Sequence, residues 1–191
     1  MNAVRFRGDR LVLVASAALL GLVPASLAGH AAAAEPPPSV VRDCASRAET
    51  TRPLRFGETT GAVRIGPLEL RGVRDWRTRK SVLQTRRDGL YRVKILAVVA
   101  ASARVTLAIA PRSTSIAALD YVQDEEPAAA VTFIGCSPRV RSRIRAGFVG
   151  PVTSFPGEFV LERPACVAIA VWTPKRPGPL LRKLALGGSC S

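Results

Sequence analysis

Histidine is nearly absent from this chain of 191 residues, whose only copy is His30 in the N-terminal segment. Ser-His-Asp and Cys-His catalysis both need an imidazole, and so do histidine-ligated metal sites. Cysteines are also few: the chain has four, and we expect all of them to form disulfides, leaving no free thiol. For the part of the chain that follows His30, these enzyme classes are excluded, and we expect neither a metal nor a cofactor.

Long apolar runs are lacking too. The longest, residues 11–23, holds about 13 residues, fewer than the roughly 20 that a membrane-spanning helix needs. Three arginines precede it, and the small residues Ser26 and Ala28 stand where a signal peptidase would cut. The pattern predicts a signal peptide over residues 1–34, a secreted or envelope-associated protein, and no transmembrane segment in the mature chain.

The rest of the chain divides into a short arm and one domain. Residues 35–61 are rich in proline and polar side chains, which predicts a flexible arm. Over residues 62–191, aliphatic and β-branched runs alternate with glycine and proline at the 8 to 12 residue spacing typical of sandwiches. We predict an all-β domain, an immunoglobulin-like antiparallel sandwich of about seven to nine strands. The expected strands are residues 62–70, 89–97, 104–110, 117–122, 129–136, 157–161, 166–172 and 180–186.

Such a sandwich narrows the pairing of the four cysteines. Cys136 ends one expected strand and Cys166 begins another, while Cys44 and Cys190 lie near the two ends of the mature chain. Among the three connectivities we predict one bridge from Cys136 to Cys166 and one from Cys44 to Cys190. A four-cysteine zinc site is the alternative, but such sites pair ligands at short spacing, and here no two cysteines are closer than 24 residues.

Positive charge dominates the surface chemistry. The chain has 28 basic and 14 acidic residues, a net charge of +14, and the predicted mature chain keeps about +12 because its signal carries three arginines and one aspartate. In an extended backbone, alternation places on one face the four guanidiniums of Arg139, Arg141, Arg143 and Arg145. We predict an anion-binding surface there for a cell-wall polymer or an acidic lipid. The alternative is a solvated face in an arginine-biased composition.

A second basic stretch surrounds Trp76. Its cations are Arg74, Arg77, Arg79, Lys80, Arg86 and Arg87. Single-stranded nucleic acid is held on aromatic side chains interleaved with such charges, and Trp76 stands nearly alone. Nucleic acid is therefore disfavoured as a partner, and Trp76 and Trp172 are interpreted as core or rim residues.

Carboxylates are the remaining candidates for catalysis. They fall into two groups, Asp120, Asp124, Glu125 and Glu126 in the first and Glu158 and Glu162 in the second. A glycoside hydrolase needs two carboxyls facing each other across a cleft, and sequence shows proximity only. A solvated hairpin loop explains the first group, and a weak calcium site from Asp120, Asp124 and Glu126 is the alternative. We do not expect an enzyme.

Two segments carry a resemblance. They are Thr132-Phe133-Ile134-Gly135-Cys136 and, from Phe155-Pro156-Gly157-Glu158-Phe159 onwards, the stretch that ends at Pro164-Ala165-Cys166-Val167. Together with Ile65-Gly66-Pro67-Leu68, Tyr91-Arg92-Val93 and Gly188-Ser189-Cys190, they are similar to a set of uncharacterised secreted actinobacterial proteins. In that family a second glycine usually precedes the phenylalanine, where this chain has Glu158. The resemblance implies the compartment, the β fold and the disulfides, and it carries over no catalytic residue.

These observations lead to one expectation with two alternatives. We expect a secreted, non-catalytic β-sandwich protein that binds anionic envelope polymers through arginines. The first alternative is an extracellular module that docks a protein partner through a sheet edge or through residues 173–179. The second is a carboxylate-based glycan hydrolase.

Overall fold

The computed structural model describes residues 35–48, 54–73, 84–85, 89–121, 126–141 and 150–190, which belong to one compact unit, Ala33–Ser191. The predicted signal peptide lies outside the described residues. The strands are β1 (Val40–Arg42), β2 (Val63–Ile65), β3 (Leu68–Arg71), β4 (Gln84–Thr85), β5 (Tyr91–Lys94), β6 (Leu96–Ala100), β7 (Arg104–Ile109), β8 (Ala117–Asp120), β9 (Ala130–Ile134), β10 (Val152–Phe155), β11 (Glu158–Leu161), β12 (Ala165–Trp172) and β13 (Leu180–Leu186). Two short 3-10 helices, η1 (Cys44–Ser46) and η2 (Pro111–Ser113), accompany them. The prediction of an all-β protein is confirmed.

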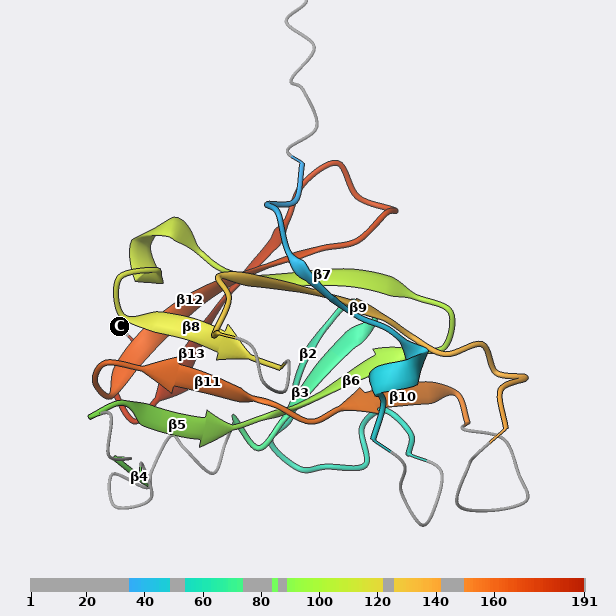
Figure 1. The fold of residues 1–191 in the computed structure, drawn as a ribbon, viewed down its shortest axis with the longest axis horizontal. Helices are drawn as coiled ribbons and strands as arrows, with labels where there is room; N and C mark the ends of the chain where they lie inside the picture. The colour runs from blue at the N-terminus through green and yellow to red at the C-terminus, as the bar shows by residue number, and fades with distance from the viewer. Residues whose placement is uncertain are drawn as a thin grey trace, which may run out of the picture. The chain divides into compact units, whose positions relative to one another are not determined.

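The strands form three hydrogen-bonded sheets (Figure 1). One has five strands in the order β1-β9-β7-β12-β13, and two have four, in the orders β10-β6-β3-β2 and β4-β5-β11-β8. The two smaller sheets are joined twice, because β5 leads through one residue into β6, and β10 leads through Pro156 and Gly157 into β11. The described pairs are antiparallel except that of β1 with β9.

One apolar core receives side chains from all three sheets. Alternate residues of β7 (Val105, Leu107) and β12 (Ile169, Val171) are buried there, as the two-residue period of a strand requires. The largest buried rings pack edge to face or tilted: Tyr121 lies 5.1 Å from Phe133, and Phe133 lies 5.2 Å from Phe155, between ring centroids. A core shared between sheets is what the alternation of polar and apolar residues predicted.

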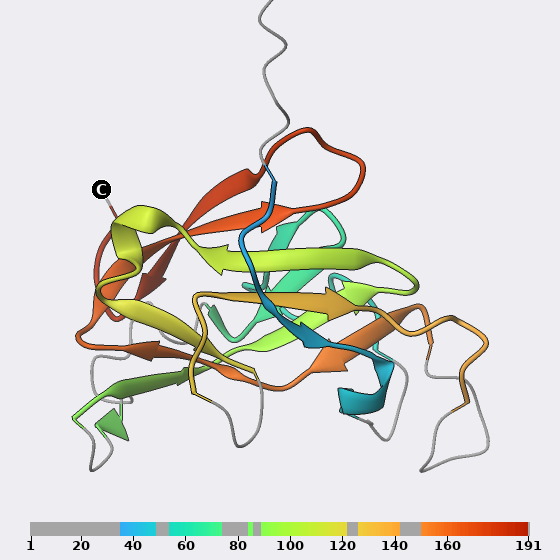
Figure 2. The same cartoon turned by 45° about the horizontal axis from the view of Figure 1, so that its top comes forward.

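The segment expected to be a flexible arm contains a strand. Val40–Arg42 pairs in parallel with Val131, Thr132 and Phe133 of β9, and Ala48 forms a bridge with Ser154 of β10. Figure 2 shows β1 running along β9, as Figure 1 does. Three residues are too short to show alternation, and the surrounding prolines and serines gave no sign of a strand.

Other strand boundaries differ from the prediction where the chain turns. Residues 62–70 form the hairpin of β2 and β3, because Gly66 adopts a positive φ of 59° and Pro67 follows it. Residues 89–97 divide into β5 and β6 at Ile95, whose N–H donates to the carbonyl of Gly157 at 3.0 Å. Strands β4 and β10 were not predicted, whereas β13 has the expected bounds.

All four cysteines are bridged, but the predicted pairing is wrong. Cys44 is joined to Cys136 and Cys166 to Cys190. Strand β1 runs parallel to β9, so the residues after β1 lie close to the residues after β9. Cys44 of η1 is therefore close to Cys136. Because β12 and β13 are antiparallel, the residues after β13 return to the start of β12, and Gly187 forms a bridge with Ala165 beside Cys166. Neighbouring strands, rather than the two chain ends, determine the bridges.

Candidate functional site

Two of the candidate carboxylates come together on adjacent strands. Asp120 ends β8 and Glu158 begins β11, and the two residues are register partners. Arg92 of β5 reaches both with the same atom: Nη1 lies 2.8 Å from Oδ2 of Asp120 and 3.0 Å from Oε1 of Glu158. All three side chains are partly buried, with 12 to 24% of their surfaces exposed. The sequence placed Asp120 and Glu158 in separate groups, and the sheet joins them.

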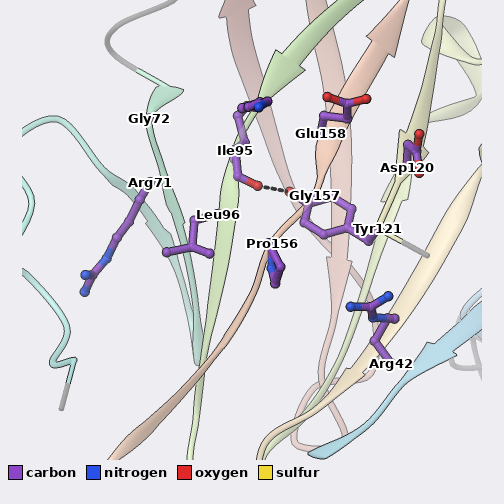
Figure 3. Close-up of a pocket in the computed structure, with 11 residues that line it drawn as sticks. Arg42, Arg71, Gly72, Ile95, Leu96, Asp120, Tyr121, Pro156, Gly157 and Glu158 are labelled. Atoms are coloured by element: carbon purple, nitrogen blue, oxygen red, sulfur yellow. Dashed lines mark hydrogen bonds between the residues drawn. The ribbon is translucent and has the colours of Figure 1, made fainter. Parts of the chain in front are cut away.

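A cavity of about 490 Å³ adjoins this cluster (Figure 3). Asp120 and Glu158 lie side by side at one end, while Arg42 and Arg71 lie on opposite sides of the view. The arginines are engaged within the protein: Arg71 Nε donates to Glu69 at 2.7 Å, and Arg42 Nη2 donates to the carbonyl of Ser46 at 2.9 Å. The cavity therefore offers a shared ion pair at one end, rather than two carboxyls facing each other across a substrate.

Tyr121 and Gly157 line the cavity at the point where the two smaller sheets join. The Tyr121 hydroxyl donates to the carbonyl of Ile95 at 2.8 Å, a bond drawn in Figure 3. Its ring lies so close to Gly157 that a Cβ placed on that glycine would stand 2.2 Å from ring atom Cδ1. The residues on either side of this junction, Phe155 and Phe159, are both fully buried. The Phe-x-Gly-x-Phe pattern thus reflects a junction packed against a tyrosine.

Burial raises the pKa of Tyr121 far above its ordinary value near 10, because the phenolate would lose its hydration. Below about pH 10 the phenol is protonated in the folded and unfolded states alike, so it adds no pH dependence. Above that pH only the unfolded chain ionises, and we expect the free energy of unfolding to fall by up to about 1.4 kcal/mol per pH unit. Urea unfolding at several alkaline pH values tests this, and Tyr121→Phe should flatten the slope; an unchanged slope would refute it.

Half of the predicted arginine face is described. Arg139 and Arg141 are exposed and follow β9 beyond Cys136, while Arg143 and Arg145 lie outside the described residues. The backbone turns here, with Val140 N–H donating to the carbonyl of Ser137 at 3.0 Å, so the extended conformation assumed in the prediction does not hold at Arg139. The carbonyl of Arg141 accepts from Arg47 Nη2 at 3.4 Å.

The other candidates are scattered. Glu126 and Glu162 are exposed, whereas Asp124, Glu125, Trp76 and the cations around Trp76 lie outside the described residues. In the described ranges no three Cys, Asp, Glu or His side chains gather as metal ligands. The sequence did not single out Arg92, although its place between the apolar neighbours Tyr91 and Val93 was the available signal. The sequence around a single arginine on a strand does not indicate which carboxylates it will contact.

Comparison of the chain with known protein families, curated proteins and solved structures finds no match. Among the described residues, no helix has the length and apolar character to cross a membrane.

Proposed function

We propose that the chain is a secreted, non-catalytic binding protein with an immunoglobulin-like β-sandwich, and that it attaches to anionic polymers of the cell envelope through its arginine-rich surface. The observation that carries the proposal is the excess of basic over acidic side chains. Cations outnumber carboxylates two to one in the chain, 28 to 14, and most of the cations in the described part of the chain are exposed.

Four of the acidic side chains are held by partners within the fold. Glu69 accepts from Arg71 and from the backbone N–H of Gly57, Asp120 and Glu158 share Arg92, and Asp43 caps helix η1. The exposed cations of the described part are Arg55, Arg64, Lys94, Arg104, Arg112, Arg139, Arg141, Arg163, Lys175, Arg176, Arg182 and Lys183. A surface with this excess of cations attracts polyanions over long range, and its guanidiniums bind phosphate or carboxylate groups by paired hydrogen bonds.

The compartment is inferred from two sources. Two disulfides are expected of a protein that matures in an oxidising environment outside the cytoplasm. The predicted signal over residues 1–34 and the resemblance to secreted actinobacterial proteins agree with that inference. The sandwich assignment draws on strands from three sheets packed around one core.

A protein-partner module is the second candidate, and one observation favours it. Strand β13 forms an edge of the five-stranded sheet, and its Leu181 is 63% exposed. A partner strand added at such an edge is held by main-chain hydrogen bonds and by pockets for alternate side chains. Capture of one partner that persists at high salt would favour this candidate over the polymer.

We expect the purified mature protein to adsorb to isolated cell walls and to be released at about 0.5 M salt, where the screening length is only a few ångströms. Replacing Arg139, Arg141, Arg143 and Arg145 together with glutamine should weaken adsorption and lower its salt dependence, because fewer counterions are displaced. A pull-down over a salt gradient measures both effects.

The matched control replaces the same four arginines with lysine, which keeps the charge and loses the fork geometry. Walls stripped of their anionic polymers provide the second control. Equal adsorption to stripped and intact walls would overturn the polymer assignment. Unchanged adsorption of the glutamine variant would show that these four arginines do not contribute to binding.

A further inference from the structure

A small pocket of about 250 Å³ lies on the outer side of the five-stranded sheet, away from the cavity of Figure 3. Its lining includes Glu35, Arg104, Thr106, Trp172 and Arg176. The loop between β12 and β13 lies beside the N-terminal segment in both ribbon views. Trp172 and Thr106 are register partners on β12 and β7, and they face outward because the residues next to them, Val171 and Val105, point into the core.

Trp172, which lines this pocket, carries an unsatisfied donor. Its indole Nε1–H is buried, and no acceptor for it is found in the described part of the chain. An indole nitrogen is a donor only, and a buried donor without a partner destabilises the folded state. Native structures rarely keep such a group unpaired, so we expect the oxygen of a water or a ligand to accept its hydrogen bond.

Two guanidiniums stand at the same pocket. Arg104 begins β7 and Arg176 lies in the β12–β13 loop, and both are exposed. Neither side chain forms an ion pair or hydrogen bond with another described residue. Glu35 also lines the pocket, yet it bonds neither to these arginines nor to Trp172 within the described part. Forked guanidinium donors suit the oxygens of carboxylate and phosphate groups.

A chain of three hydroxyls ends at the pocket. Ser39 Oγ lies 2.7 Å from Oγ1 of Thr132, which lies 2.6 Å from Oγ1 of Thr106. Thr106 and Thr132 are almost fully buried, at 6% and 2% exposed. Three hydroxyls carry three protons and these two bonds use two of them, so the chain keeps one donor in reserve. When Ser39 donates to Thr132 and Thr132 to Thr106, that donor belongs to Thr106 at the pocket wall; with both bonds reversed it belongs to Ser39.

We infer that this pocket binds an oxyanion, a phosphate or carboxylate group, carried by a single repeat unit of an anionic polymer. The inference rests on the proposed function and deepens it by locating a specific subsite. The lining residues that carry donor groups are Trp172, Arg104, Arg176 and Thr106. The volume is below the 300 to 1,000 Å³ usual for drug-sized ligands, which suits a unit the size of glycerol phosphate or one sugar acid.

The test follows the Trp172 indole directly. The chain has two tryptophans, so a ¹H–¹⁵N spectrum contains two indole resonances, and Trp172→Phe identifies that of Trp172. Glycerol 3-phosphate and glucuronate are titrated separately, with glycerol and glucose as the neutral counterparts. We expect a saturable shift of the Trp172 indole with one or both anions and none with the neutral molecules. The two anions distinguish a phosphate from a carboxylate ligand.

Arg104→Gln and Arg176→Gln should each weaken this binding about tenfold or more, because a charge-assisted hydrogen bond contributes about 1.5 to 3 kcal/mol. The matched controls are Arg112→Gln and Arg163→Gln, which remove exposed arginines that do not line the pocket. Equal weakening by pocket and control variants would show diffuse attraction and overturn the inference.

Failure of the subsite and failure of the polymer assignment give different results. If walls bind the protein in a polymer-dependent way while neither anion shifts the Trp172 indole, the subsite is refuted and the proposed function stands. If an anion binds saturably at Trp172 while intact and stripped walls adsorb the protein equally, the subsite stands and the polymer does not.

Discussion

Removing the bridge between Cys44 and Cys136 is expected to lower the free energy of unfolding by about 4.5 kcal/mol, against about 3.5 kcal/mol for the bridge between Cys166 and Cys190. The difference follows from sequence separations of 92 and 24 residues, because a longer closed loop restricts the unfolded chain more. The first bridge has a second role, since it fastens β1 and η1 to the end of β9.

Urea unfolding of two double variants, Cys44→Ala with Cys136→Ala and Cys166→Ala with Cys190→Ala, measures the two costs. Amide exchange at Val40, Val41 and Arg42 should accelerate in the first variant and not in the second, because β1 is then held by one strand alone. Peptide mapping of the unreduced protein checks the pairing itself. A peptide linking Cys136 to Cys166 would contradict the structure, and equal costs for the two bridges would contradict the loop-length argument.

Most of the strands fall within predicted segments, whereas the short strands β1 and β4 and strand β10 were not predicted. The β7 and β13 segments have long aliphatic patterns between turn residues, and both were predicted within a residue or two. Strand β10 is buried at all four positions and contains Thr153 and Ser154, so it shows no alternation. Strand β1 has three residues and gains its stability from pairing with β9, which no local pattern reports.

The ion-pair cluster and the disulfides both bring together residues that are distant in sequence. This is the main reason why neither could be predicted from the sequence. The meeting of Asp120 with Glu158 depends on the register of β8 against β11, and Arg92 joins them from a third strand. A register shift of one residue would turn these side chains to the opposite face. The pairing of the cysteines failed for the same reason, because it depends on which strands are neighbours.

The pocket at Trp172 could not be predicted from the sequence for the same reason. The sequence alone led to the interpretation of Trp172 as a core or rim residue, and the structure places it at the rim of a pocket that draws on the N-terminal segment, β7 and the β12–β13 loop. The sequence around Trp172 does not indicate that Arg104 and Thr106 of β7 line the same pocket. Alternation along β7 indicates only that both face away from the core.

Gly157→Ala is expected to destabilise the fold by about 3 kcal/mol, the upper part of the usual range for overpacking. An alanine Cβ would lie 2.2 to 2.6 Å from three atoms of the Tyr121 ring, closer than van der Waals contact allows. The ring cannot move aside easily, because it is 2% exposed, packs against Phe133 and Phe159, and is bonded through its hydroxyl to Ile95. The glycine is thus required by space at the junction of β10 and β11.

Urea unfolding of a double-mutant cycle isolates this contact. A Tyr121→Ala background removes the three atoms nearest to the added methyl group. Gly157→Ala should therefore cost less than about 1 kcal/mol there, a coupling energy of about 2 kcal/mol or more. Gly178→Ala is the matched control, because no atom lies within 4 Å of a Cβ at that position. If Gly157→Ala cost the same in both backgrounds, the clash with Tyr121 would not be its cause. Gly157 and Tyr121 both line the cavity of Figure 3. Because Gly157→Ala would displace the Tyr121 ring, we also expect it to change the shape of that cavity.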